Sequence, residues 1–493
     1  MSVVFGDGRD GNLTVISGTF NLNTDASGSR LYADGIAYRI LSDPITTVIS
    51  IGMTPNGFTS GDRALIINLQ GSTSDYGDVG NYEVVLINGV GTDYITLSEA
   101  PYRSYNGSLF ADQKVIIQRI PQYSNVTISG GGSLTTSTYD RLVTTPTGQA
   151  GYFSGVLAMM VNGTLLLDSL SDTISCNGKG YAGGAEATTN IDYSYGNTGG
   201  RTSGYNQVIA TSCNSINGGG GAGKGADASG GGGGYGTAGA NGAKSLIASD
   251  YGRGAYVFGV NTLDRLYFGG GGGSAGSHDG GRYGAAGGNG GGIIYIQAMS
   301  VINRGYITAN GDNGYNGVFI YNNFNSGAGG GGGAGGSIYL RVLTLESSGD
   351  LIAAVKGNGG VHAVESQGKS GGKGGDGRVR VDYSIVNGTN YPDTITINDI
   401  VAPDPYESRL PEGWYYFSGH TKMISIPISR ILYCYRRDTG QFMGSTTSSG
   451  DGSFNLITTY SGAHFLVALD DEGGADYNDI IIGNVVPYYY NPM

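Results

Sequence analysis

The densest group of potential metal ligands lies near the C-terminus, in the stretch DDEGGADYND (470–479). Carboxylate and amide oxygens at this density are ligands that Ca²⁺ prefers, so Asp470, Asp471, Asp476 and Asp479 form a candidate calcium site. Their spacing differs from that of an EF-hand loop, and a solvated acidic turn is the alternative. We expect no other cofactor.

Catalytic motifs occur elsewhere, but without the elements that their chemistry needs. AVESQGKS (363–370) fits a relaxed phosphate loop, yet GGKGGDG follows it where a helix should begin. GKSGG (368–372) matches GxSxG without a strand before it and a helix after it. The histidines show neither HxxxH nor HExxH spacing. We therefore predict that the chain is not an enzyme. A glycan-cleaving enzyme with two carboxylates across a cleft is the alternative.

Residue types suited to recognition fill the segments between glycine tracts. Tyr, Asn, Ser and Gly provide large contact area at low entropic cost together with adaptable hydrogen bonding, and aromatic faces also suit sugar rings. We predict that these segments are binding loops. The candidate contact residues are Tyr251, Tyr256, Phe258, Tyr267, Tyr315, Phe319, Tyr321 and Phe324. The alternative is that such side chains cover the glycine scaffold, which has no hydrophobic core of its own.

Composition restricts the class of protein. Of 493 residues, 94 are glycine and 36 are tyrosine, yet 39% are hydrophobic, which indicates a folded chain rather than a linker. The net charge of −12 argues against nucleic-acid and anionic-membrane partners. The longest apolar run, VLAMMV (156–161), is too short for membrane insertion. The three dispersed cysteines are typical of a reducing compartment without a disulfide framework.

A recurring phrase, glycine followed by a short strand, indicates a repeat. It occurs as SGVLAMMV (154–161), GGIIYIQA (291–298), GGSIYLRV (335–342) and DGRVRVDY (376–383). In three cases a second phrase follows: TISCNGKG, YITANGDNG or LIAAVKGNGG. Units of this kind bury their apolar faces on their neighbours. The glycine tracts between them can form left-handed helices with three residues per turn, whose backbone groups bond to adjacent strands. Flexible linkers are the alternative.

These textures predict an all-β protein in four parts. Residues 1–150 form an N-terminal β-domain, and 151–384 form a glycine-rich scaffold of short strands and polyglycine II-type helices with Tyr- and Asn-rich loops. Residues 385–410 are a proline-bearing linker. Evenly spaced short strands predict a C-terminal β-sandwich over 411–493.

The C-terminal part resembles a known family. RILYCYRRDTGQFMGSTTSSGDGSFNLITTYSGAHFLVALDDEGGADYNDIIIGNVVP (430–487) is similar to the transthyretin-like or carboxypeptidase-regulatory-like β-sandwich that closes many phage and prophage tail proteins. The shared features are a strand ending in RDTG, a GDGSF turn, and VALDD followed by YND and a final VVP. Such modules are non-catalytic, which implies a structural or adhesive cap.

The glycine-rich middle resembles the receptor-binding adhesins of T-even-like phages, in which stacked polyglycine helices carry variable loops that touch the host. The resemblance rests on GGGGG-type tracts that alternate with Tyr- and Asn-rich loops. The order of strands around each tract departs from that family.

The N-terminal sequence MSVVFGDGRD has no basic start or apolar core, so we expect no secretory signal. An adhesive composition without that route fits virion proteins, which are made in the host cytoplasm and released by lysis. We therefore predict a phage tail fibre or adhesin on the virion tail or surface. Its predicted partners are a host-surface glycan or protein, other virion proteins and further copies of itself. A virion decoration or fibre-shaft protein without a receptor role, and a cellular surface-filament protein, are the alternatives.

Overall fold

The structure is a computed structural model. The residues that it describes are 5–72, 74–107, 110–140, 154–186, 199–202, 215, 218–224, 228–243, 250–276, 284–317, 327–347, 351–362, 369–386, 415–420, 422–423, 426–427, 431–438, 440, 442–449, 453–458, 463–468, 480–485 and 488–489. They are almost entirely strands and extended segments, with one 3₁₀ turn over Phe110–Asp112 in the described part, which confirms the all-β prediction. No helix among these residues is long and apolar enough to cross a membrane.

Contacts divide the chain into two compact units. The larger contains residues 5–381, and the smaller contains 407–493. Each is described separately below.

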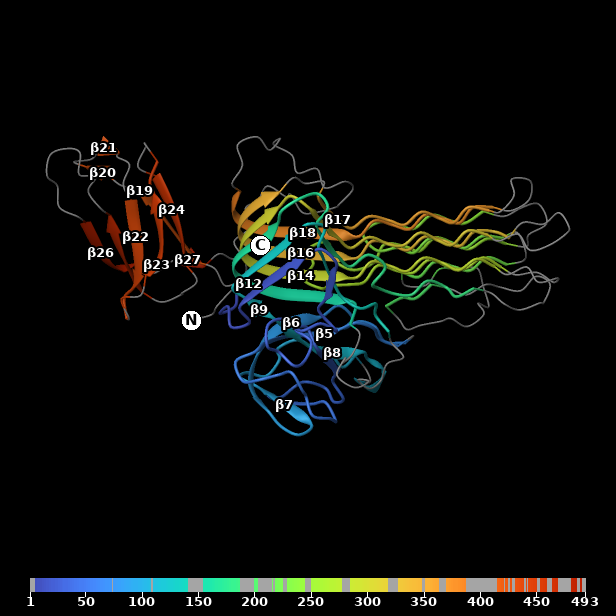
Figure 1. The fold of residues 1–493 in the computed structure, drawn as a ribbon, viewed down its shortest axis with the longest axis horizontal. Coiled ribbons are helices and arrows are strands. Elements are labelled where there is room, and N and C mark those ends of the chain that lie inside the picture. The colour runs from blue at the N-terminus through green and yellow to red at the C-terminus, as the bar shows by residue number, and fades with distance from the viewer. Residues whose placement is uncertain are drawn as a thin grey trace. The chain divides into compact units, whose positions relative to one another are not determined.

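The centre of the larger unit is a solenoid of two parallel sheets (Figure 1). Successive coils of the chain pass first through sheet one and then through sheet two. In order across the sheet, sheet one contains β1 (Asn12–Ile16), β10 (Asn125–Ser129), β12 (Val156–Leu167), β14 (Ile293–Asn303), β16 (Ser337–Ser347) and β18 (Arg378–Val386), and β9 (Gln122–Tyr123) pairs with the start of β12. Sheet two contains β2 (Thr19–Asn21), β11 (Ser133–Thr135), β13 (Thr173–Ser175), β15 (Tyr306–Thr308) and β17 (Ile352–Ala353).

The repeated sequence phrases occupy equivalent places in this solenoid. Val156 of β12 lies beside Ile293 of β14, which lies beside Ser337 of β16. The second phrases align in the same way in sheet two, where Ile174, Ile307 and Ile352 are neighbours. All these pairings are parallel, because each coil returns to the same starting edge. The repeat in the sequence is therefore a stack of coils that bury their apolar faces on one another.

A six-stranded antiparallel sheet is inserted between β2 and β9. Its order is β3 (Ala37–Arg39), β8 (Val115–Ile120), β5 (Arg63–Asn68), β6 (Tyr82–Val90), β7 (Tyr94–Leu97) and β4 (Val48–Ser50). The expected N-terminal domain ended at residue 150, but β1 and β10 belong to the same sheet as β12. The solenoid therefore begins within the first 150 residues.

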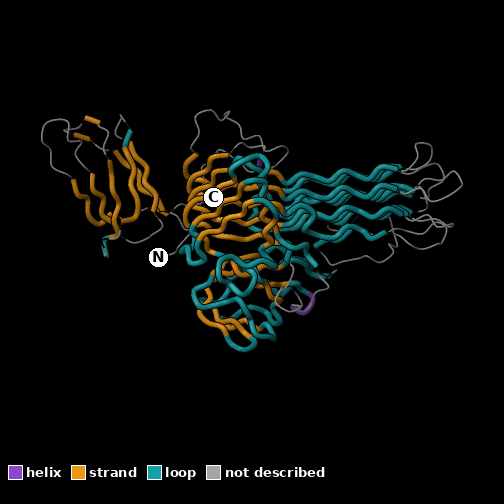
Figure 2. Tube along the Cα trace, in the orientation of Figure 1, coloured by secondary structure: helices purple, strands orange, loops and turns teal. Residues whose placement is uncertain are grey.

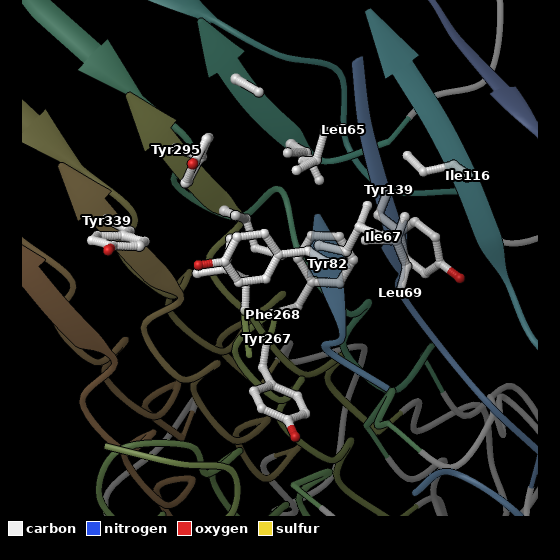
Figure 3. Close-up of a cluster of buried hydrophobic side chains, with 14 of the residues drawn as sticks. Leu65, Ile67, Leu69, Tyr82, Ile116, Tyr139, Tyr267, Phe268, Tyr295 and Tyr339 are labelled. Carbon is white, nitrogen blue, oxygen red and sulfur yellow. The ribbon is translucent and has the colours of Figure 1, made fainter. Parts of the chain in front are cut away.

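An aromatic core joins the inserted sheet to sheet one (Figure 3). Tyr82 of β6 packs edge-on against Tyr295 of β14, with ring centroids 5.7 Å apart, and Tyr295 packs in turn against Tyr339 of β16 at 5.7 Å. All three rings are buried. Edge-to-face aromatic pairs of this kind add to the stability gained from burial alone.

The smaller unit is built from antiparallel sheets. One contains β24 (Ser453–Thr458), β19 (Tyr415–His420) and β27 (Tyr488–Tyr489), and another contains β23 (Phe442–Thr447), β22 (Ile431–Arg436), β25 (His464–Ala468) and β26 (Ile480–Val485). A short pair joins β20 (Lys422–Met423) and β21 (Ile426–Pro427). Leu432, Cys434, Leu456 and Leu466 form its described core.

Candidate binding surface

The glycine tracts form a bundle of extended segments beside the solenoid (Figure 2). We call the following segments the glycine bundle: 180–184, 199–202, 218–224, 228–235, 237–243, 250–256, 269–276, 284–292, 309–317, 327–336, 355–361 and 369–377. Their backbone groups are bonded between segments rather than within them. The glycine tracts are therefore built elements where the structure describes them.

The segment 327–336 shows how the bundle is held together. Consecutive N–H groups of this segment donate to three different neighbouring segments in turn, so each neighbour accepts a bond from every third residue. The N–H groups of Gly329, Gly332 and Gly335 donate to the C=O groups of Lys369, Gly372 and Gly375, respectively. Those of Gly330, Gly333 and Gly336 donate to Tyr315, Asp312 and Ala309. Those of Gly331 and Ala334 donate to Gly273 and Gly270, and all eight bonds measure 2.7–3.0 Å. A period of three residues is that of a polyproline II-type helix. The first neighbour runs parallel to the segment and the other two run antiparallel.

Three further neighbours donate to the carbonyl groups of the same segment. They are 230–233, 288–291 and 357–360. The central segment therefore has six bonded neighbours, and few of its buried backbone groups are left without a partner.

Close approach explains why these positions are glycine. A Cβ on Gly333 would overlap the carbonyl oxygen of Asn289, and one on Gly331 would overlap that of Gly231. Real Cβ atoms do not come this close to backbone atoms. The absence of side chains lets neighbouring backbones meet at hydrogen-bonding distance.

Many hydrogen bonds between neighbouring segments involve an asparagine that is followed by glycine. We call this arrangement the Asn–Gly clamp: the Asn Oδ1 accepts an N–H from a neighbouring segment, and the next Gly N–H donates to a C=O of that same neighbour. In the Asn313–Gly314 clamp, Asn358 N donates to Asn313 Oδ1 at 2.7 Å and Gly314 N donates to Asn358 O at 2.8 Å. The described clamps are Asn177–Gly178, Asn241–Gly242, Asn289–Gly290, Asn310–Gly311, Asn313–Gly314 and Asn316–Gly317.

Sequence reasoning missed these clamps, although the sequence contains their signal. Asn310, Asn313 and Asn316 recur every third residue, each followed by glycine. They grip Val355, Asn358 and Val361, which recur with the same period. A three-residue Asn–Gly period inside a glycine-rich region therefore predicts which segments lie side by side.

The two ends of the bundle differ. At one end the segments pass directly into the solenoid, since Gly292, Gly336 and Gly377 immediately precede β14, β16 and β18. At the other, distal end the described chain leaves and re-enters the bundle five times. These exits and returns are 224 and 228, 243 and 250, 276 and 284, 317 and 327, and 362 and 369. Every segment that connects two tracts in this way therefore starts and finishes at the distal end.

Two predicted contact residues lie toward the distal end. Tyr315 is 66% exposed, and its backbone bonds to Ala286 and Gly330. Tyr251 is half-buried beneath the Arg253 guanidinium, which lies 4.1 Å from the ring centroid. Arg253 also pairs with Asp250 at 3.4 Å. Arg253 therefore covers one face of the Tyr251 ring, and its guanidinium and the Asp250 carboxylate are the polar groups of this cluster that can hydrogen-bond to a ligand.

Three other predicted residues lie near the solenoid end. Tyr256 is exposed, but its neighbour Ala255 bonds to Gly232, far along the segment from the distal end. Tyr267 is buried in the aromatic core, where its backbone N donates to Ser337 Oγ at 3.1 Å (Figure 3). Phe258 is partly buried against the same core and packs edge-on against Tyr267 at 5.5 Å.

The core placement corrects two of the sequence expectations. Tyr267 and Phe258 cover the root of the bundle, which needs apolar contacts because glycine supplies none. This is the covering role that the sequence left as the alternative. The expected contact residues Phe319, Tyr321 and Phe324 lie outside the described residues, as do Asp470, Asp471, Asp476 and Asp479 of the candidate calcium site. Among the residues that are described, no cluster of three or more His, Cys, Asp or Glu is arranged to hold a metal.

The largest charge network lies away from the bundle. Arg119 of β8 is buried and contacts Asp10 at 2.7 Å and Asp62 at 2.9 Å, while Tyr123 donates to Asp34 at 2.6 Å. Burial, followed by the neighbouring Asp34 carboxylate, holds the pKa of the Tyr123 hydroxyl well above its usual value. The paired charges join the inserted sheet to the solenoid rather than form an open site.

Comparisons with known proteins give a limited result. No family model matches the chain, and no curated protein matches it. Two solved structures of phage tailspikes show weak similarity. For the tailspike protein gp49 from Pseudomonas phage LKA1, identity is 14% and TM-score 0.16, over 33% of this chain and 26% of that one. For the Gp54 tailspike of Acinetobacter baumannii bacteriophage AP22, solved with A. baumannii capsular saccharide, identity is 10% and TM-score 0.15, over 68% of this chain and 53% of that one. The chain thus spans at most about half the length of these structures.

Proposed function

We propose that this chain is a phage tail fibre or adhesin that attaches the virion to a host-surface carbohydrate or protein. The observation that carries the proposal is the distal end of the glycine bundle. Five connecting segments start and finish there, and the bundle that holds them is bonded through its backbone. Because the described tracts bond to one another through their own backbone, we expect the scaffold to tolerate changes in the connecting segments.

The chemistry of the connecting segments supports recognition rather than catalysis. The connecting segment 318–326, VFIYNNFNS, combines aromatic residues with Asn and Ser, which favour broad contacts with many weak polar interactions. Among the described residues that flank these segments, Asp250 is held by Arg253 and by the backbone N of Tyr251. This pairing joins one carboxylate to a cation, whereas a general acid and a nucleophile need two carboxylates across a cleft.

We further propose that the smaller unit is a non-catalytic cap in contact with other virion proteins, that the chain works as a homo-oligomer, and that it lies on the virion tail or surface. The sequence resemblance of the smaller unit to modules that close tail proteins supports this assignment. A calcium ion at Asp470, Asp471, Asp476 and Asp479 belongs to the same proposal.

The decisive experiment replaces 277–283 and 318–326 with Gly-Ser linkers of equal length in the full chain. Binding of the fluorescently labelled protein to host cells should be lost, while hydrogen exchange of the bundle amides stays unchanged. Tyr315→Ala should weaken binding, whereas Tyr102→Ala, which changes an exposed ring on the inserted sheet, should not. Full binding by the linker variant would instead favour a fibre-shaft or decoration protein.

Two further measurements separate the remaining alternatives. Immunogold labelling with antibody against 245–327 should decorate phage tails, and gold on cell-surface filaments would contradict the proposal. Incubation with purified host polysaccharide should leave its size distribution unchanged, whereas shortening would identify a glycan-cleaving enzyme.

A further inference from the structure

The Asn–Gly clamps have a chemical consequence for the dipeptides that form them. In an Asn–Gly sequence the glycine main-chain N can attack the asparagine Cγ. The N–Cγ bond forms, the Cγ–Nδ2 bond breaks, ammonia carries away the amide nitrogen and the displaced proton, and a succinimide ring remains. Water then opens the ring to aspartate or to isoaspartate. No oxidant or reductant is needed.

A clamp engages both reacting groups in hydrogen bonds to a neighbouring segment. In the Asn310–Gly311 clamp, Gly311 N–H donates to Val355 O at 2.9 Å and the Asn310 Oδ1 accepts from Val355 N at 2.8 Å. Attack would break both bonds and turn the side chain away from its partner. Breaking each of the two hydrogen bonds should lower the reaction rate a few-fold, so that together they slow the reaction by about tenfold or more.

Asn358–Gly359 is an Asn–Gly dipeptide of the bundle with a different environment. The main-chain N–H and C=O of Asn358 are bonded by the Asn313–Gly314 clamp, but Asn358–Gly359 does not itself form a clamp on another described segment. Within the described part of the chain, neither the Asn358 side chain nor the Gly359 N–H forms a hydrogen bond, and the Asn358 side chain is exposed. Both reacting groups are therefore uncommitted and open to water.

We propose that Asn358–Gly359 is a deamidation site of the glycine bundle and that the six clamped dipeptides are protected from the same reaction. Isoaspartate at 358 would insert an extra atom into the main chain between Gly357 and Gly360, whose N–H groups bond to Gly333 and Gly330 at 2.9 and 2.8 Å. The three-residue period would then be lost beside the distal end. The reaction is thus a slow, irreversible change in one of the segments that lead to the distal end.

The experiment compares dipeptides within one molecule and needs no variant. The full chain is incubated in mildly alkaline buffer, and peptide mapping by mass spectrometry follows deamidation and isoaspartate at each dipeptide over time. The same chain in concentrated urea supplies the unprotected rate at every position. We expect Asn358 to convert about tenfold faster than Asn310, Asn313 and Asn316 in the folded protein, and all four to convert at similar rates in urea.

Two results would overturn the proposal. If Asn358 in the folded chain converts much more slowly than in urea, at the rate of Asn313, the missing clamp does not create a site. If Asn313 in the folded chain converts as fast as it does in urea, the clamp does not protect. Both comparisons are independent of host binding, so they stand or fall separately from the proposed function.

Discussion

Replacing Gly333 by alanine tests the packing of the glycine bundle most directly. Gly333 lies in the segment 327–336, which has bonded neighbours on all sides, and an added Cβ would overlap the carbonyl oxygen of Asn289. The overlap is with main-chain atoms, so a change of rotamer cannot relieve it. The segment 284–292 must then move away by on the order of 1 Å.

The cost follows from the bonds that join these two segments. Gly288 N donates to Gly331 O, and Gly291 N donates to Ala334 O, both at 2.8 Å. A shift of about 1 Å stretches both beyond the limit of a hydrogen bond, at about 3.5 Å. Each lost bond leaves buried groups without a partner, at a cost of about 1–3 kcal/mol per bond. We therefore expect the free energy of unfolding to fall by about 2–6 kcal/mol.

Thermal and urea unfolding of the full chain measure the loss, and hydrogen exchange locates it. The midpoint should fall by about 3–8 °C for a unit of this size, with faster exchange confined to the bundle amides. Gly77→Ala is the control, because an added Cβ at that position meets nothing within 4 Å and should change stability by less than about 0.5 kcal/mol. Equal stability of the Gly333→Ala variant and the parent would refute the close packing of the segments.

Further predictions concern single side chains. Arg119→Met should destabilise the larger unit by about 3–5 kcal/mol in urea titrations, because two buried carboxylates lose their counter-ion; an unchanged midpoint would contradict the network. Asn313→Ala should speed exchange of the Asn358 amide by about tenfold, because the bond at 2.7 Å is lost; unchanged exchange would remove the clamp's contribution. Tyr267→Ala should cost about 3–5 kcal/mol by emptying a core position, and a neutral result would contradict its burial. Burial raises the pKa of the Cys434 thiol to about 12, so iodoacetamide at neutral pH should label it only after unfolding, and rapid labelling of folded protein would refute this.

The sequence was sufficient to predict the strands, because they show short alternating or apolar patterns between glycines. Val156, Ile293 and Ser337 begin neighbouring strands, and the four phrases that contain or precede them were recognised as one repeat. The start of the solenoid was not recognised, because β1 and β10 are separated by the inserted sheet, and a strand partner more than a hundred residues away leaves no local pattern.

The binding surface could be predicted only in part, because composition does not distinguish a tyrosine that covers glycine from one that faces a ligand. Tyr315 and Tyr267 both lie within two residues of glycine in the sequence, yet the first is exposed and the second is buried. The difference arises from position along the bundle: Tyr267 stands at the solenoid end, where aromatic rings fill the core, and Tyr315 stands toward the distal end. Position along a tract, counted from the strand that follows or precedes it, is the better guide.

The three-residue period also explains why side chains concentrate where they do. An interior segment has backbone neighbours on all sides, so a Cβ at its glycine positions displaces a neighbour, whereas Ala328 and Ala334 mark positions where a methyl group is accommodated. An outer segment has at least one direction without a backbone partner, and there a short amide side chain can supply the missing acceptor, as Asn310 and Asn313 do. The connecting segments at the distal end are not part of these bonded tracts in the sequence. Variation that alters binding without loss of stability is therefore expected in those segments, and variation within the tracts should be limited to glycine, alanine, serine and asparagine.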